Sequence, residues 1–120
     1  MADHNKTGEE GEKIAAEYLL GKSYAILEMN WRHRKYEIDI IASNDKFLIV
    51  VEVKTRQGRQ PVEAEKAVTR EKQRNLVRAA NAYVNMNGLK EEVRFDIIVI
   101  ERQGDKQEIR HLEDAFYPLL

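Results

Sequence analysis

The sequence predicts a mixed α/β fold in which helices flank a central sheet. Two segments carry apolar side chains at helical spacing, and five shorter segments, rich in apolar and β-branched residues, are separated by polar turns. In chain order they give a helix, three strands, a second helix, a fourth strand and an edge strand. An order of this kind favours a mixed sheet covered by helices.

The first helix is predicted over residues 8–20. Thr7, followed three residues later by Glu10, matches a capping box, in which two side chains bond the free N–H groups of a helix start. Gly21 is expected to end the helix in the left-handed conformation that glycine tolerates. Glu12 falls on the apolar side of this helix, so we expect an inside partner to receive it. That side also carries Gly11, Ala15 and Leu19.

The other elements follow from short apolar runs and the turns between them. Residues 43–46 form a polar turn, which makes the second and third strands a hairpin. A long second helix is predicted from residue 62 or 63 to residue 86, with its end near Gly88, and the apolar tail at 115–120 is expected to pack back on the body. The predicted strands cover residues 24–31, 36–42, 47–54, 94–101 and 107–112.

The composition is typical of one globular domain. The chain has 120 residues, of which 42% are hydrophobic and 34% charged, and this length allows a modest core. We therefore expect a single domain over residues 1–120. No apolar run approaches the roughly 18 residues of a membrane helix, and residues 1–7 lack the apolar core of a signal peptide. The absence of cysteine excludes disulfides and thiolate zinc sites. A cytoplasmic protein without membrane contact is expected.

Charge is balanced overall and clustered locally. With 20 basic and 21 acidic residues the net charge is −1, which is not the bulk signature of a nucleic-acid binder. Three basic clusters are residues 32–35; Lys54, Arg56 and Arg59; and Lys66, Arg70, Arg74 and Arg78, which share one helix face. Each cluster taken singly is typical of a solvated surface. Their positions around acidic strands favour a functional role.

The most informative pattern is charge at the end of an apolar strand. Glu52 and Lys54 follow the apolar run 47–51 and lie on one face, because side chains alternate along a strand. Burying such charges is costly without a partner. A second acidic pair, Glu37 and Asp39, lies on the preceding strand. These acids indicate a metal site that works on phosphodiesters. The alternative is a surface hairpin in which lysines balance the acids, since sheets with one wet face are common.

The register of the hairpin decides which acids meet. If Asp39 faces Glu52, then Ser43 faces Leu48, whereas a slip of two residues brings Glu37 opposite Glu52. Opposed side chains have Cβ atoms about 4.5–5.5 Å apart. Two carboxylates at that distance raise one pKa unless a cation lies between them. Oxygen ligands favour a hard divalent ion, Mg²⁺ or Mn²⁺.

Each predicted helix also carries one charged residue in register with its apolar side. Lys72 shares the inward stripe of the second helix, and Glu12 that of the first. Both side chains are therefore expected to point toward the sheet. The alternative for each is that its charged end reaches past the apolar surface to solvent.

Several short motifs are spread along nearly the whole chain. They are Gly8-x-x-Gly11-Glu12, Tyr18-Leu19, Asn30-x-Arg32, Glu37-Ile38-Asp39, Val51-Glu52-Val53-Lys54-Thr55-Arg56, Lys72 and Arg94-Phe95-Asp96. In this order they resemble the PD-(D/E)XK nuclease superfamily, which has a restriction-endonuclease-like αβββαβ core. The fuller pattern resembles the YraN family of small bacterial proteins within it. The Asp/Glu-x-Lys signature is weak alone and specific in this combination.

The resemblance implies a metal-dependent active site. By position, Asp39 and Glu52 resemble the metal-binding acids of the superfamily, joined by the Val53 carbonyl, and Lys54 resembles its catalytic lysine. Glu12 resembles the helix-borne acid of the archaeal Holliday-junction resolvase branch. The implied catalytic residues are Glu12, Asp39, Glu52 and Lys54, and the implied metal ligands are Asp39, Glu52 and Val53.

Two positions depart from the pattern. Tyr36 stands where the family usually has glycine, and its ring alters access to the site or offers a surface on which a base could stack. Ile38 precedes Asp39 where the superfamily's name has proline. Neither change removes a metal ligand. Lys72 lies where the superfamily often has a helix residue that supports the site, and Asp96 is interpreted as structural support.

We therefore expect a nuclease, acting internally or from an end, that uses Mg²⁺ or Mn²⁺ to hydrolyse phosphodiester bonds in DNA, including branched or structured DNA. One alternative is a catalytically silent nucleic-acid-binding or assembly module that retains the fold. The clustered acids favour the enzyme, because a module that only binds nucleic acid does not need acids that repel phosphate. A protein-interaction domain that uses the apolar tail at 116–119 is a third reading, and a homodimer is compatible with the first. The expected nucleic-acid contacts are Arg56, Arg70, Lys72, Arg74 and Arg78.

Overall fold

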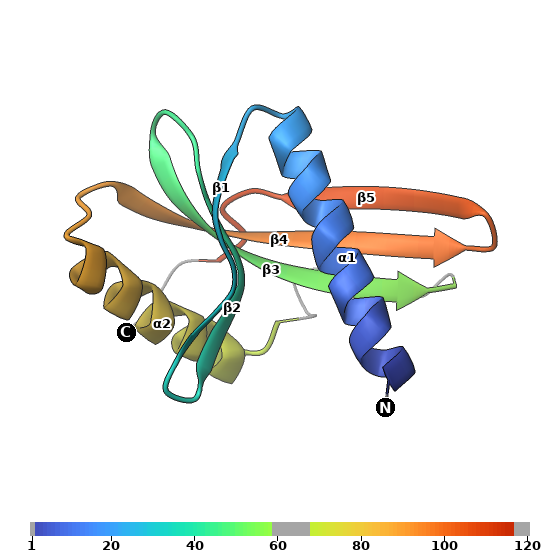
Figure 1. Ribbon diagram of the computed structural model, residues 1–120, viewed down its shortest axis with the longest axis horizontal. Helices are drawn as coiled ribbons and strands as arrows, with labels where there is room; N and C mark the ends of the chain where they lie inside the picture. The colour runs from blue at the N-terminus through green and yellow to red at the C-terminus, as the bar shows by residue number, and fades with distance from the viewer. Residues whose placement is uncertain (1, 59–67, 117–120) are drawn as a thin grey trace.

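The computed structural model describes residues 2–58 and 68–116 (Figure 1). In chain order its elements are α1 (Ala2–Gly21), β1 (Ala25–His33), β2 (Tyr36–Ser43), β3 (Phe47–Gln57), α2 (Arg70–Asn87), β4 (Glu92–Gln103) and β5 (Lys106–Leu112). The predicted fold class, a mixed sheet flanked by helices in the order αβββαβ with an added edge strand, is confirmed.

The sheet follows the order of the chain. Its strands lie as β1-β2-β3-β4-β5. The central pair β3–β4 is parallel, and the other neighbouring pairs are antiparallel. A parallel pair needs a crossover connection, and α2 lies within it. Figure 1 shows α1 crossing over β3 and β4, with α2 toward the other end of the molecule, at the lower left, where one end of the helix overlaps the β1–β2 hairpin in this view.

The central strand β3 is covered on both faces. Val50 belongs to an apolar cluster with Leu76 of α2, whereas its neighbour Val51 belongs to a second cluster with Leu19 of α1. Successive residues of a strand point to opposite faces, so α1 and α2 pack on opposite sides of the sheet. The continuous apolar run of β3 is what a strand buried on both faces requires.

β2 and β3 separate halfway along their length. Their ladder ends at the pair Ile40–Val51, beyond which β2 stays paired with β1 and β3 with β4. We call this point the fork. Figure 1 shows the β1–β2 hairpin and the β3–β4–β5 sheet running in different directions past it. Asp39 and Glu52 are the first residues beyond the last pair, so the fork places both acids at the same opening.

The predicted hairpin is confirmed, and the structure decides between the two registers that the sequence leaves open. Ser43 pairs with Leu48, which is the register that brings Asp39 next to Glu52 and excludes the slip by two residues. Each observed strand extends the predicted one or shifts its ends by one to three residues.

The β1–β2 hairpin is strongly twisted. Ile38 packs in the cluster on the α2 side, although Ile40, which a flat strand would place on the same face, packs in the cluster on the α1 side. The register of β1 shifts between Ile26 and Glu28, and a bulge of this kind increases local twist. The part of the hairpin beyond the fork is thereby turned away from the plane of the sheet.

The start predicted for the first helix is wrong, whereas its predicted end, residue 20, lies within one residue of the observed end at Gly21. α1 begins at Ala2, so the backbone of Thr7 lies inside the helix and does not cap it. The left-handed residue at the other end is Ser23, with φ of 69°, and not Gly21. Two matching residue types are enough for a capping-box pattern, so it also occurs where a helix simply continues.

The second helix begins later than predicted. α2 starts at Arg70, and the Thr69 side chain accepts a backbone N–H of the first turn as its N-cap. Because Thr69 is extended, one continuous helix from residue 62 or 63 is wrong. Residues 59–67, which include Lys66, lie outside the described residues. The predicted end is confirmed, since Gly88 has a left-handed φ of 60°.

Ala115 and Phe116 pack against the core on the α2 side, and Phe116 stacks on Phe95 with 5.2 Å between ring centroids. This part of the tail packs back as predicted, and residues 117–120 lie outside the described residues. Neither described helix combines the length and the apolar character needed to cross a lipid bilayer.

Candidate metal-binding active site

A cleft of about 310 Å³ opens at the fork. It is lined by Gly8, Glu12, Asp39, Glu52, Val53, Lys54, Thr55 and Arg56. All four residues predicted to be catalytic are among them, although they come from three different elements. Asp39 of β2 and Glu52 of β3 face the cleft because side chains alternate along a strand, and Glu12 reaches it from α1.

Asp39 takes the place of a backbone partner at the fork. Its Oδ2 accepts a hydrogen bond of 2.9 Å from the Val53 N–H, which the β2–β3 ladder no longer pairs. This bond fixes the carboxylate at the mouth of the opening. Burial raises the pKa of Asp39, and the hydrogen bond from Val53 and the charges of Lys72 and Lys54 oppose the rise.

Glu52 is a buried acid, only 4% exposed. Its Oε1 lies 3.6 Å from Lys54 Nζ and 3.8 Å from Lys72 Nζ. Its Oε2 is buried and has no hydrogen-bond partner within the part of the chain that the structure describes. Burial and the charge of Asp39 raise the pKa of Glu52 to about 7, against the attraction of the two lysines. A buried oxygen without a partner is costly, so a cation at this position would stabilise the site.

Lys72 reaches the acids from α2. It lies in the first turn of that helix, which Thr69 caps by accepting the Lys72 backbone N–H at 3.1 Å. Its ammonium group lies near Glu52, so the prediction that Lys72 points toward the sheet is confirmed. Lys54 and Lys72 thus approach one carboxylate from a strand and from a helix.

Glu12 enters the cleft from the opposite layer. α1 comes very close to β3 at Gly11, where an added Cβ would overlap the Thr55 hydroxyl. This close approach brings the next residue, Glu12, to the rim of the opening between β2 and β3. Burial raises the pKa of Glu12, and the nearby charge of Asp39 raises it further. The prediction that Glu12 points toward the sheet is confirmed, since its half-buried side chain lines the cleft between β2 and β3.

The donor set fits a hard divalent ion with water among its ligands. Asp39 and Glu52 supply carboxylates, and Val53 lines the cleft beside them. Across residues 2–58 and 68–116, no three His, Asp or Glu side chains gather closely enough to hold one ion on their own. Glu12 lines the same cleft as Asp39 and Glu52 but does not form such a group of three with them. Mg²⁺ usually keeps several waters and needs one or two carboxylates, which matches this set.

The predicted nucleic-acid contacts fall into two groups. Arg56 lines the cleft, and Lys72 contacts Glu52 at its edge. Arg70, Arg74 and Arg78 are exposed on α2 and are not part of the cleft lining. The sequence did not single out Thr55 or Gly8 as cleft residues. A glycine on the apolar side of α1 is the one signal that indicates a close approach at Thr55.

A second buried polar network lies outside the cleft lining. Asp96 is 1% exposed. Arg94 donates to its two oxygens at 2.9 and 2.8 Å, His111 Nε2 lies 2.7 Å from Oδ2, and the Asp114 N–H donates to Oδ1 at 3.0 Å. Burial alone would raise the pKa of Asp96, and the bonds from His111 and Arg94 lower it below the usual value. Because both oxygens of Asp96 are bonded within the fold, we interpret this acid as structural support, as in the sequence analysis.

The architecture and the site together define a class of protein. A five-stranded mixed sheet between two helices, with paired acids beside lysines where two strands separate, is consistent with a restriction-endonuclease-like core.

Comparison with known proteins identifies the family. The model of the uncharacterised protein family UPF0102 matches residues 11–100. Over 98% of both chains, the sequence is 45% identical to a UPF0102 protein of Flavobacterium psychrophilum and 44% identical to one of Christiangramia forsetii. It is 41% identical to a UPF0102 protein of Bacteroides thetaiotaomicron over 100% of this chain and 99% of that one. The chain belongs to family UPF0102, which is the YraN family that its motifs resemble. Membership of the PD-(D/E)XK superfamily stays a prediction.

Proposed function

We propose that this protein is a metal-dependent nuclease that hydrolyses phosphodiester bonds in DNA. The observation that carries the proposal is the buried acid pair at the fork. Glu52 has an oxygen without a partner among the described residues, and two lysines lie beside it. Acids with raised pKa values in a cleft are typical of functional sites. The motif resemblance supports phosphodiesters as the substrate class.

Hydrolysis joins a water oxygen to phosphorus while the bond to the leaving oxygen breaks and that oxygen takes up a proton. A bound Mg²⁺ or Mn²⁺ would lower the pKa of a water and offset the charge that develops on the phosphate. Asp39 and Glu52, with the Val53 carbonyl, would hold the ion. The Asp39 carboxylate is already oriented by its bond from the Val53 N–H.

The two lysines would supply the positive charge that the reaction needs on the protein side. Lys54 Nζ, held 3.6 Å from Glu52, is placed to orient the attacking water and to stabilise negative charge on the phosphate. Lys72 favours the ionised form of Glu52 and hence its use as a ligand. Glu12, on the facing wall of the cleft, would position a water or a second ion.

The arginines give DNA a path to the cleft. Arg56 lies at the cleft itself and would bind a phosphate next to the one that is cut. The exposed stripe of Arg70, Arg74 and Arg78 would hold the backbone farther away, in contacts that position DNA without reading its sequence. A preference for branched or structured DNA is supported by the resemblance of the Glu12 motif to the resolvase branch.

The first prediction is that Glu52→Gln removes both divalent-ion binding and DNA cleavage. Calorimetric titration with Mn²⁺ is compared for the wild type, Glu52→Gln and Asp39→Asn, and each protein is incubated with linear, flap and four-way DNA. We expect the heat of binding to be lost and the cleavage rate to fall by at least about 100-fold, because one of two carboxylate ligands becomes a neutral amide.

Glu108→Gln is the matched control, since it removes one exposed carboxylate from β5. It should bind Mn²⁺ and cleave as the wild type does. Unchanged Mn²⁺ binding in Glu52→Gln would remove the proposed site. Mn²⁺ binding by the wild type without cleavage of any of these substrates would instead favour a silent nucleic-acid-binding module.

A further inference from the structure

We propose that the tip of the β1–β2 hairpin binds the phosphate backbone of DNA at a fixed distance from the acidic cleft. The hairpin tip is defined as Arg32, His33, Arg34 and Lys35. This inference rests on the proposed nuclease function, because the DNA bound by the tip would be the substrate of the acidic cleft. The arginines already assigned to DNA lie on β3 and α2, so the tip is a separate surface.

The tip concentrates positive charge that the fold leaves exposed. Arg34 and Lys35 are exposed, and the Arg32 side chain is 74% exposed. Arg32 lies 3.8 Å from Glu37, and an exposed pair at that separation contributes little. The cleft, in contrast, is lined by three acids that repel phosphate. A polyanion can approach such a cleft if cations beside it supply the attraction, which the chain's net charge of −1 does not.

The tip is held in a fixed position by its packing on α2. A two-stranded hairpin is only marginally stable alone. Trp31 packs edge-on against Tyr83 of α2, with 5.1 Å between ring centroids, and His33 stacks on Trp31 at 5.8 Å. The Tyr83 hydroxyl also donates to Glu28 of β1 at 3.3 Å. Cations on a braced hairpin lose less freedom on binding than cations on a loose loop.

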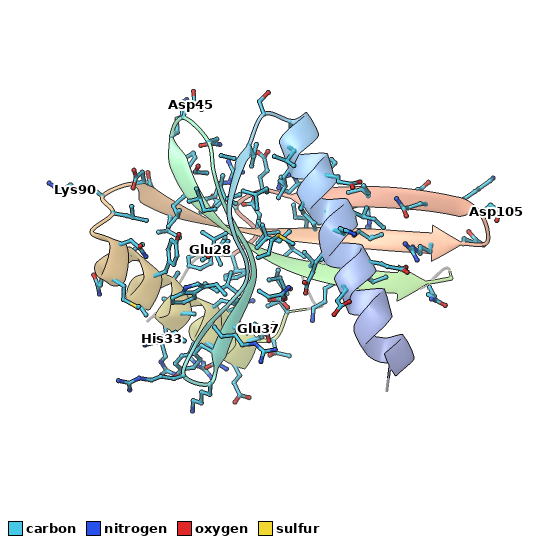
Figure 2. The ribbon with its side chains drawn as sticks, viewed as in Figure 1. Glu28, His33, Glu37, Asp45, Lys90 and Asp105 are labelled. Carbon is cyan, nitrogen blue, oxygen red and sulfur yellow. The ribbon has the colours of Figure 1, made fainter. Side chains whose placement is uncertain are left out.

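β2 links the tip to the cleft directly. Lys35 stands four residues before Asp39, a separation of about 13 Å along an extended chain. Figure 2 shows His33 near the tip and Glu37 on the adjoining start of β2. Successive phosphates of one B-DNA strand advance about 3.4 Å along the helix axis. The tip would therefore contact the backbone about four base pairs from the phosphate at Asp39.

The test removes two charges from the tip and two from elsewhere. The tip variant is Arg34→Asn with Lys35→Gln, because Arg34 has φ of 57° and Asn tolerates this left-handed conformation. The control is Lys90→Gln with Lys106→Gln, which gives the same net charge. Both lysines are exposed, and Figure 2 shows Lys90 and Asp105, the neighbour of Lys106, at opposite ends of the molecule away from the tip. Binding to a short fluorescent DNA duplex is followed by anisotropy in EDTA at several NaCl concentrations.

We expect the tip variant to bind about tenfold more weakly and to reduce the slope of log K against log [NaCl] by about 1.8, since each lost phosphate contact is worth about 0.9. The control should stay within about twofold of the wild type. Equal binding by the tip variant and the wild type, an equal loss in the control, or no binding by the wild type would each overturn the proposal.

EDTA keeps this outcome separate from that of the nuclease proposal. If DNA binding depends on the tip but the protein cuts no substrate when Mn²⁺ is supplied, the proposal that the tip binds DNA is supported and the nuclease proposal is contradicted. If the tip variant binds DNA as the wild type does and still cleaves it, the nuclease proposal is supported and the proposal that the tip binds DNA is contradicted.

Discussion

At the scale of single residues, Glu52 is held where its own charge is unfavourable. Burial and Asp39 raise its pKa to about 7, and Lys54 and Lys72 offset only part of that rise. Near neutral pH the metal-free acid pair therefore retains a proton that it would give up when a divalent ion binds. Ion binding and proton release are linked in this way wherever ligands must be deprotonated.

The second prediction is that the metal-free protein loses stability as pH rises from about 5 to 8. The folded-state pKa of Glu52, about 7, lies above the unfolded value near 4.5, so the folded state holds the proton more tightly. Its stability is then highest below the unfolded pKa and falls until pH exceeds the folded pKa. The loss is about 3 kcal/mol, from roughly 1.4 kcal/mol per pKa unit. Urea unfolding in EDTA at pH 5 and 8 measures it.

Glu52→Gln should remove most of this pH dependence, because the amide does not titrate. Glu108→Gln should leave it unchanged. Mn²⁺ should restore stability at pH 8 in the wild type and not in Glu52→Gln. A pH dependence of equal size in the wild type and Glu52→Gln would show that another group is responsible.

Much of the site could be predicted residue by residue from periodicity. Strand alternation placed Asp39 beside Glu52, and helix register turned Glu12 and Lys72 toward them, because both rules depend only on spacing along the chain. The buried oxygen of Glu52 and its raised pKa could not be predicted. They depend on how tightly three elements close around one carboxylate, which spacing does not specify.

At the scale of elements, α1 is positioned by its contact with β3. Gly11 is buried against Thr55, whose hydroxyl occupies the space that a Cβ at residue 11 would need. Gly8, one turn earlier, has open space around it. Two glycines of one helix therefore have different roles, and Gly11 sets the distance between the helix and the sheet at which Glu12 meets the cleft.

The third prediction is that Gly11→Ala destabilises the fold by about 1–3 kcal/mol, the usual range for added volume in a packed contact. Thr55→Ala introduced into the same protein should recover most of this loss, because it removes the overlapping hydroxyl. Gly8→Ala should instead raise stability by up to about 1 kcal/mol through helix propensity. Chemical denaturation of the four proteins compares them. Failure of Thr55→Ala to rescue Gly11→Ala would contradict the proposed contact.

The elements were easier to predict than their ends. The hairpin of β2 and β3 was predicted correctly from the apolar runs and the polar turn, whereas its register was left open between two alternatives and only the structure decides between them. The start of α1 was wrong because a cap depends on one or two side chains that compete with simple continuation of the helix. The predicted start of α2 was wrong because Thr69 is extended and caps the helix. The helical spacing of the residues around Thr69 does not reveal this interruption.

At the scale of the whole molecule, one buried network ties together elements that are far apart in the chain. Asp96 of β4 binds His111 of β5, and the Tyr18 hydroxyl of α1 lies 3.2 Å from the other ring nitrogen of His111. Arg94 also donates to the Tyr24 hydroxyl, just before β1. The β2–β3 ladder that joins the two halves of the sheet ends at the fork, so the bond from Arg94 of β4 to Tyr24, which precedes β1, adds a polar link between them.

The last prediction is that Asp96→Ala lowers the free energy of unfolding by about 3–5 kcal/mol, because it removes the carboxylate 2.8 Å from the Arg94 guanidinium and leaves that buried charge with only a longer contact of 3.9 Å to the more exposed Glu113. Arg94 is only 11% exposed, so water cannot replace the lost carboxylate. Glu101→Ala is the control, since it breaks a more exposed pair with Arg110 and should cost at most about 1 kcal/mol. Urea unfolding of both variants at pH 7 measures the difference. Equal losses in the two variants would show that the Asp96 network contributes no more than an ordinary surface ion pair, and the two parts of the sheet would then be joined by the β2–β3 ladder and apolar packing without a substantial contribution from this network.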